Sequence, residues 1–204
     1  AFQGRGVGHQ LLKQAANLSI RRGCQSITIH NPAEGALDFY VRSGFRLYRE
    51  YDEYVVKVKP YKGPVEHRGL PTYEEICQLP LQLGRYQSQR ECYDMLRWEQ
   101  SPGAVALPGL RTRDFYMNAW LPLAQGNQAF LALRPTIGAQ RPRLYLYTPE
   151  LDSELIGRVL GVVHQQHFTE ATLLLERGTG GILKGIPVVE KKAGQKMLIF
   201  TPRG

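Results

Sequence analysis

A glycine-rich segment stands directly before an amphipathic helix at the start of the chain, and it constrains the fold more than any other feature. The segment covers residues 3–9 (Q-G-R-G-V-G-H) and fits the pattern Q-x-x-G-x-G. Glycines let a backbone approach a ligand closely. The helix that follows presents unpaired N–H groups and the positive end of its dipole. Together these features predict a cradle for a diphosphate.

Other phosphate-binding loops fit the segment less well. No Gly-Lys-Ser/Thr follows it, which excludes the loop of nucleoside triphosphatases on its own pattern. A dinucleotide-binding unit requires G-x-G-x-x-G after a strand, and Gly4, Gly6 and Gly8 do not have that spacing. On the loop alone, a simple turn stays open as an alternative.

Hydrophobic periodicity predicts that helices and strands alternate over the first 60 residues. Gly23 follows two arginines, as is typical of a helix end. The expected elements are a helix over 10–22, a strand over 25–30, a short helix over 34–43, and two strands over 45–48 and 53–58 that pair around residues 50–52.

Three pieces of this stretch keep a fixed order and spacing. They are the loop with two leucines behind it, R-R-G-C leading to I-T-I-H over 21–30, and A-L-D-F-Y-V-R-S-G-F over 36–45. A chain with these pieces resembles the GNAT superfamily of N-acetyltransferases over roughly residues 1–60. The resemblance implies an α/β fold, with a GNAT-like mixed sheet flanked by helices. It also implies acetyl-coenzyme A as co-substrate.

The resemblance implies roles residue by residue. The loop would bind the coenzyme A pyrophosphate through backbone N–H groups. Tyr40 would lie near the coenzyme sulfur and protonate the leaving thiolate, although it could equally be a packed aromatic side chain. His30 could act as the base or be structural. The catalytic candidates are therefore Tyr40 and His30, and the cofactor-binding candidates are Gln3, Arg5, Gly6, Val7, Gly8, His9, Asn31 and Arg42.

Two of the cofactor candidates have plain alternatives. Asn31 could bind the pantetheine arm or only shape the turn with Pro32. The family often has Asn directly before its second short helix, where this chain has P-A-E-G, which puts that contact in doubt. Arg42 could reach a coenzyme phosphate or simply be solvated.

Beyond residue 58, the pattern predicts a second α/β lobe. Residues 59–73 are rich in Pro and Gly and predict a linker or crossing loop, and Thr72 with Glu75 predicts a capping box. The further expected elements are helices over 73–79, 87–98 and 149–166, strands over 129–134, 143–147 and 170–176, a turn over 178–181, and a hairpin of strands 186–190 and 196–201 around residues 193–194.

The linker divides the chain into residues 1–61 and 62–204. The second lobe then repeats the order of helices and strands expected in the first segment. It is either a degenerate GNAT-like copy or an unrelated α+β domain. Pro149-Glu150-Leu151-Asp152 stands where a phosphate cradle would be, and its acidic groups would repel a diphosphate. We therefore expect the second lobe not to bind coenzyme A.

Composition excludes several classes of protein. The net charge of +8 is spread along the chain, so a nucleic-acid binder is the least favoured function. The three cysteines, Cys24, Cys77 and Cys92, lack disulfide or zinc spacing and fit a reducing cytoplasm. His164 and His167 have no acidic or cysteine partner nearby in sequence, so no metal site is predicted. No apolar run is long enough to cross a membrane.

The predicted function is transfer of an acetyl or short acyl group from acyl-coenzyme A to a primary amine. The alternative is a non-catalytic module on the same fold that binds acyl-coenzyme A or another protein. Because the motif begins within three residues of Ala1, we interpret the GNAT-like segment as N-terminally truncated. We expect strands before Ala1, and we expect no acyltransferase activity from these 204 residues alone. The sequence indicates neither the acceptor amine nor the oligomeric state.

Overall fold

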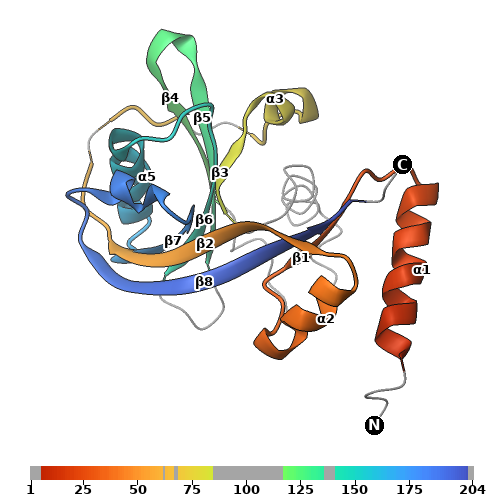
Figure 1. Ribbon diagram of the computed structural model, residues 1–204. Helices are drawn as coiled ribbons and strands as arrows, with labels where there is room; N and C mark the ends of the chain where they lie inside the picture. Colours follow the sequence, from red (N-terminus) through yellow and green to blue (C-terminus); the bar gives the residue numbers. More distant parts are fainter. Residues whose placement is uncertain (1–5, 62, 67–68, 85–116, 136–140, 202–204) are drawn as a thin grey trace, which may run out of the picture. The chain divides into compact units, whose positions relative to one another are not determined.

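The computed structural model describes residues 6–61, 63–66, 69–84, 117–135 and 141–201 (Figure 1). Helices and strands alternate along much of this part of the chain. Their order is α1 (Val7–Arg21), β1 (Ile27–His30), the 3-10 turn η1 (Glu34–Ala36), α2 (Leu37–Arg42), β2 (Arg46–Lys57), α3 (Tyr73–Gln78), β3 (Leu81–Leu83), β4 (Met117–Pro122), η4 (Ala124–Gly126), β5 (Gln128–Pro135), β6 (Pro142–Tyr147), α5 (Ser153–Gln165), β7 (Glu170–Glu176), η5 (Thr179–Leu183) and β8 (Val188–Phe200).

Contacts divide the chain into two compact units. The first unit is formed by residues 1–51 together with 194–204, and the second by residues 52–193. The strands follow the order β1-β8-β2-β7-β6-β5-β4, with β3 paired to β6. The boundary predicted between residues 61 and 62 falls inside the second unit, and a domain boundary at that point stays a prediction.

The first unit contains the elements predicted from the glycine-rich segment onward. Helix α1 ends at Arg21, and Gly23 follows in the left-handed conformation with φ 74°, as predicted from the sequence. The predicted short helix is a 3-10 turn that continues into α2. Strand β1 pairs antiparallel with the end of β8, so that Ile27 lies opposite Phe200 and His30 opposite Met197.

Strands β2 and β8 are long, and both pass from one unit into the other. The sequence predicted a turn inside each of them, and both predictions are wrong. The polar residues that suggested a turn in β2 include Asp52, which is buried in the sheet and paired with Lys191 and Arg177. In β8 the strand continues through Gly194, which has φ 97°, instead of reversing there.

The buried carboxylate of Asp52 links β2 to β8 and to the segment that follows β7. Its oxygens lie 3.0 Å from Lys191 Nζ and 3.5 Å from Arg177 Nε. Burial raises the pKa of Asp52, but hydrogen bonds and charge from Lys191 and Arg177 outweigh burial and hold the pKa below its ordinary value of 3.8. The charged form of Asp52 therefore stabilises the folded state.

Replacing this carboxylate is expected to destabilise the protein in a pH-dependent way. Asp52→Asn should lower the free energy of unfolding by about 1–3 kcal/mol at neutral pH. Because the pKa is lower in the folded state, the contribution is present above the unfolded pKa and is lost as the pH falls through the folded pKa. Urea unfolding at neutral pH and below pH 3.8 measures this difference.

Glu190→Gln is the matched control, because Glu190 is an exposed carboxylate paired with Arg141 and Lys192 at the surface. It should change the free energy of unfolding by less than about 1 kcal/mol. Equal effects of the two substitutions, or an Asp52→Asn effect that does not shrink in acid, would contradict the assignment.

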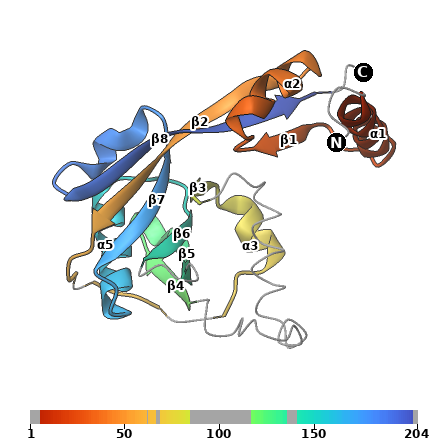
Figure 2. The same cartoon turned by 90° about the horizontal axis from the view of Figure 1, so that it is seen from below.

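The second unit is a sheet with a helix on each face (Figure 2). Strands β4, β5 and β6 are antiparallel, and β6 and β7 are parallel. On one face α5 covers Leu131 and Leu133 of β5, and on the other Ile76 of α3 lies in a cluster with Phe130. Burial on both faces makes β5 a central strand of the core.

Apart from the hairpin expected around residues 193–194, most predicted elements of the second unit have a counterpart in the structure. Helix α3 begins with the predicted capping box of Thr72 and Glu75. Helix α5 begins at Ser153, later than predicted, because the side chain of Asp152 caps it. The expected turn over 178–181 contains the start of η5. Strands β3 and β4 were not predicted, and the helix predicted over 87–98 lies outside the described residues.

Candidate functional site

The first turn of α1 is an open helix N-terminus. Gly6 is its N-cap residue in the left-handed conformation, with φ 70° and ψ 0°, and no side chain caps the helix. The first turn contains no acidic residue. Since Gln10 N–H is bonded to the Gly6 carbonyl at 3.1 Å, the N–H groups of Val7, Gly8 and His9 precede the helical ladder and have no partner within the helix. Such a turn favours an anion.

Helix α5 has the opposite arrangement at its N-terminus. Asp152 Oδ1 accepts a hydrogen bond from Leu155 N–H at 2.7 Å, and Glu154 adds a second negative charge to the first turn. These carboxylates already place negative charge and a hydrogen-bond acceptor at the N-terminus of α5, so a further anion is not favoured there. Of these two helices, α1 is therefore the one with an N-terminus suited to an anionic ligand.

Gly6 and Gly8, the two glycines of the Q-x-x-G-x-G motif, have different structural roles. Gly6 has a positive φ, and a Cβ there would meet nothing within 4 Å. A Cβ on Gly8 would lie 3.1 Å from the ring of Phe39, so Gly8 lets α1 pack closely against α2. The sequence assigned the same backbone role to both residues, whereas the structure distinguishes a conformational role at Gly6 from a packing role at Gly8.

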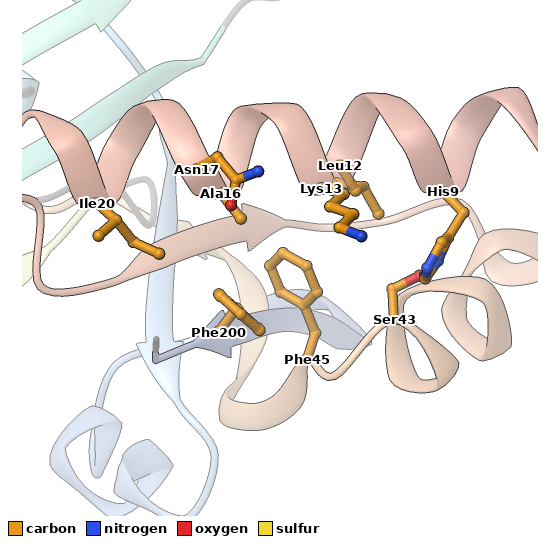
Figure 3. Close-up of a pocket in the computed structure, with 9 residues that line it drawn as sticks. All are labelled: His9, Leu12, Lys13, Ala16, Asn17, Ile20, Ser43, Phe45 and Phe200. Carbon is orange, nitrogen blue, oxygen red and sulfur yellow. The ribbon is translucent and has the colours of Figure 1, made fainter. Parts of the chain in front are cut away.

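A pocket of about 290 Å³ lies within the first unit beside this turn (Figure 3). Ser43 Oγ donates to the Phe39 carbonyl at 2.8 Å and lies 3.4 Å from His9 Nδ1. Because the Ser43 proton is already donated, His9 Nδ1 is the donor in the second contact. The residues that line the pocket are His9, Leu12, Lys13, Ala16, Asn17, Ile20, Ser43, Phe45 and Phe200.

Tyr40 and His30, the predicted catalytic residues, lie on different elements of the first unit. Tyr40 is half-buried on α2, with its ring centroid 5.2 Å from that of Phe39 and 5.8 Å from that of Phe45. His30 ends β1, and its Nε2 lies 3.1 Å from Thr28 Oγ1. Their roles in catalysis stay predictions.

Asn31 follows β1 in the left-handed conformation, with φ 45°. Its N–H donates to the Lys196 carbonyl at 2.7 Å, so the last part of β8 holds this turn. Asparagine adopts this conformation more readily than most other non-glycine residues, so Asn31 suits the turn. Arg42 is exposed, and its Nε donates to the Asp38 carbonyl at 3.2 Å. Gln3 and Arg5 lie outside the described residues.

Several residues of this site were missed in the sequence. Lys13 and Asn17 follow the predicted His9 at intervals of four residues on α1, and this spacing could have shown a shared polar edge. Phe200 and Lys196 gave no such signal, because they reach the site through strand pairing from the other end of the chain. Residues 164 and 167, noted for their histidines, belong to the second unit.

Two negative findings concern the described residues only. No helix among them is both long and apolar enough to span a membrane. They also contain no group of three or more His, Cys, Asp or Glu side chains that could hold a metal ion.

The fold is that of the GNAT acetyltransferases. The chain resembles a GCN5-related N-acetyltransferase from Sphaerobacter thermophilus, with a TM-score of 0.50 and 15% identity over 100% of this chain and 70% of that one. It also resembles a GCN5-related N-acetyltransferase from Anabaena variabilis ATCC 29413, with a TM-score of 0.50 and 10% identity. That match covers 97% of this chain but only 51% of the other, so this chain spans about half of that protein. The predicted mixed sheet flanked by helices is confirmed.

The family resemblance is confirmed in the segment that suggested it. Residues 1–45 match the model of the acetyltransferase (GNAT) family. The comparison with curated proteins gave no match. The family pattern thus covers α1, β1 and α2, and it includes the open helix turn and every residue that lines the pocket except Phe200 of β8.

Proposed function

We propose that this chain binds acyl-coenzyme A at the first turn of α1 and serves the transfer of an acetyl or short acyl group to a primary amine. The observation on which this proposal rests is the open N-terminus of α1. Left-handed Gly6, the absence of a side-chain cap and the absence of acidic residues leave three N–H groups available to a pyrophosphate. The N-terminus of α5 in the same chain is capped by a side chain, so an open N-terminus is a feature of α1 and not of both helices.

Acyl transfer requires from the protein a proton donor for the departing sulfur, a proton acceptor for the amine and a group that orients the coenzyme. When bound, acyl-coenzyme A supplies a thioester carbonyl, whose carbon forms a bond with the amine nitrogen as the bond to sulfur breaks. In this proposal the hydroxyl of Tyr40 gives its proton to the departing sulfur, and the neutral imidazole of His30 takes a proton from the amine. Asn31, held by Lys196, would orient the arm of the coenzyme.

A non-catalytic module on the same fold is the second candidate. Two observations favour it. The ring of Tyr40 packs between Phe39 and Phe45, as a structural aromatic residue does, and the contact with Thr28 occupies one ring nitrogen of His30. Such a module would bind the coenzyme without acylating an amine, so product formation with acetyl-coenzyme A and an amine distinguishes the two.

The proposal is tested by a substitution at Gly6. Gly6→Val is expected to lower the affinity for coenzyme A at least about tenfold, since a β-branched residue does not adopt the left-handed conformation that sets the direction of the three N–H groups. Isothermal titration of the wild-type chain and the variant measures this change.

Gly185→Val provides the matched control. Gly185 also has a positive φ, 81°, and a Cβ there would also meet nothing within 4 Å, but it lies in the second unit. Both variants should lose similar stability, about 1–2 kcal/mol, and only Gly6→Val should lose affinity. Unchanged binding by Gly6→Val, or an equal loss in the control, would contradict the proposal.

A further inference from the structure

We propose that the second unit contains a binding site for an extended peptide, between the parallel strands β6 and β7, and that the chain fills this site with its own strand β3. The ligand class is a short extended segment with apolar side chains. The inference goes beyond coenzyme binding and is independent of it, because every residue that carries it belongs to the second unit.

The path of β6 and β7 predicts a crevice at the end of β6. The two strands are parallel and are connected by α5, and near its start β6 pairs with β7, with Arg143 opposite Thr172. The other edge of β6 pairs with β5 from Pro142 to Tyr147. In open α/β sheets, ligands bind in the crevice outside the carboxyl ends of the strands. The corresponding place here is the β7 side of β6 at its last residues.

Strand β3 occupies this place (Figure 2). Leu81 and Leu83 pair antiparallel with the last two residues of β6, and β3 also contacts β7. Thr148 N–H, directly after β6, donates to the Pro80 carbonyl at 2.9 Å. Because β5 already pairs with the opposite edge of β6, β3 lies on the edge that β7 uses near the start of the strand. The chain itself therefore pairs with the backbone that an added strand would use.

A register shift in β3 lets its two leucines fill both faces of the crevice. In a regular strand, residues two apart point to the same face. The shift lies between Leu81 and Leu83 and separates them. Leu83 is 1% exposed and lies in the core cluster that includes α5, whereas Leu81 packs against the cluster of Phe130 on the other face. Gln82 between them is exposed. A peptide that replaces β3 therefore needs an apolar side chain at both outer positions.

Gly84 directs the chain out of the crevice. It has φ 146°, which a residue with a side chain rarely adopts, and a Cβ there would lie 2.8 Å from the ring of Tyr145. The occupant therefore ends on a glycine that passes close to an aromatic ring. The pattern that the crevice accepts is L-x-L-G, which residues 81–84 supply.

The test weakens β3 in the full chain and offers its sequence as a separate peptide. Leu83→Ala removes the buried side chain that holds β3 in place. A fluorescently labelled peptide of residues 79–84 (L-P-L-Q-L-G) supplies the missing leucine. By fluorescence polarisation, the variant should bind this peptide at least about tenfold more tightly than the wild-type chain does. A peptide with alanine at the position of Leu83 should bind the variant at least about tenfold more weakly.

Leu121→Ala is the matched control. Leu121 is fully buried in the same core cluster but lies on β4, so the same atoms are lost without weakening β3. The control should not bind the peptide. Hydrogen exchange of Thr148 N–H, which β3 protects, should be at least about tenfold faster in Leu83→Ala than in Leu121→Ala.

Three results would overturn the inference. The first is peptide binding by neither variant or equally by both. The second is equal exchange of Thr148 N–H in the two variants. The third is unfolding of the second unit in Leu83→Ala but not in Leu121→Ala, because β3 would then be a structural strand of the core and not the occupant of a site.

Discussion

A chain that ends after residue 193 is expected to lose all measurable binding of coenzyme A, although the family pattern lies in residues 1–45. Residues 194–204 belong to the first unit. They supply the antiparallel partner of β1, the carbonyl of Lys196 that holds Asn31, and the ring of Phe200 in the pocket. Without them, β1 has no partner among the described strands, and the pocket loses one of its aromatic walls.

The control for this deletion must show that the second unit stays folded. Trp120 is buried in that unit, so its fluorescence in a Trp98→Phe background reports on the core there. A peptide of residues 194–204 added to the shortened chain should restore part of the coenzyme binding, because β8 acts through backbone pairing. Full affinity of the shortened chain without the peptide would show that the last strand is not part of the site.

Phe130→Ala is expected to lower the free energy of unfolding of the second unit by about 3–5 kcal/mol. Phe130 is fully buried on β5, with its ring centroid 5.1 Å from that of Trp120 and 6.0 Å from that of Tyr147. Both of these neighbours are themselves buried, so the cavity cannot be filled without moving the sheet or α3. Urea unfolding followed by circular dichroism measures the loss.

Phe130→Leu distinguishes cavity formation from the loss of a special aromatic contact. It keeps most of the buried volume and should lose roughly half as much stability as the alanine variant. Val188→Ala is the second control, because Val188 is 44% exposed and should change stability by less than about 0.5 kcal/mol. A Phe130→Ala effect as small as that of Val188→Ala would contradict the described core.

The local features of the first unit could be predicted from sequence because neighbouring residues decide them. The periodicity of α1 and the glycine that ends it each depend on a few adjacent residues, and so does the capping box of Thr72 in the second unit. The open helix N-terminus follows from the same local pattern. The contrast with α5 was also predicted, from the acidic residues Glu150 and Asp152 near its start, although the position of Asp152 as the cap was not.

Features that depend on distant segments could not be predicted. The polar residues near Asp52 suggested a turn, because nothing local shows that Lys191 and Arg177 neutralise a buried carboxylate there. Strand β4 contains Asn118 and Pro122, which weaken a strand pattern, and it is stabilised by pairing with β5. The pairing of β1 with β8 cannot be predicted from the residues of either strand alone.

The second unit keeps the order of strand, helix and strand in β6, α5 and β7. A degenerate copy of the GNAT fold fits this order, and we propose it as the origin of the unit. If the second unit is such a copy, α1 and α5 occupy equivalent positions, and only α1 has kept an open N-terminus that could bind a coenzyme. The number of coenzyme molecules bound per chain depends directly on that difference.

Isothermal titration of the wild-type chain with coenzyme A is the most direct measurement of the central claim, that the first turn of α1 is a coenzyme site. One molecule is expected to bind per chain, and binding should be lost in Gly6→Val. An α5 variant, Asp152→Ala, should leave the number bound at one, because α5 does not contribute a site. No heat of binding at millimolar coenzyme A, or full binding in Gly6→Val, would contradict the claim.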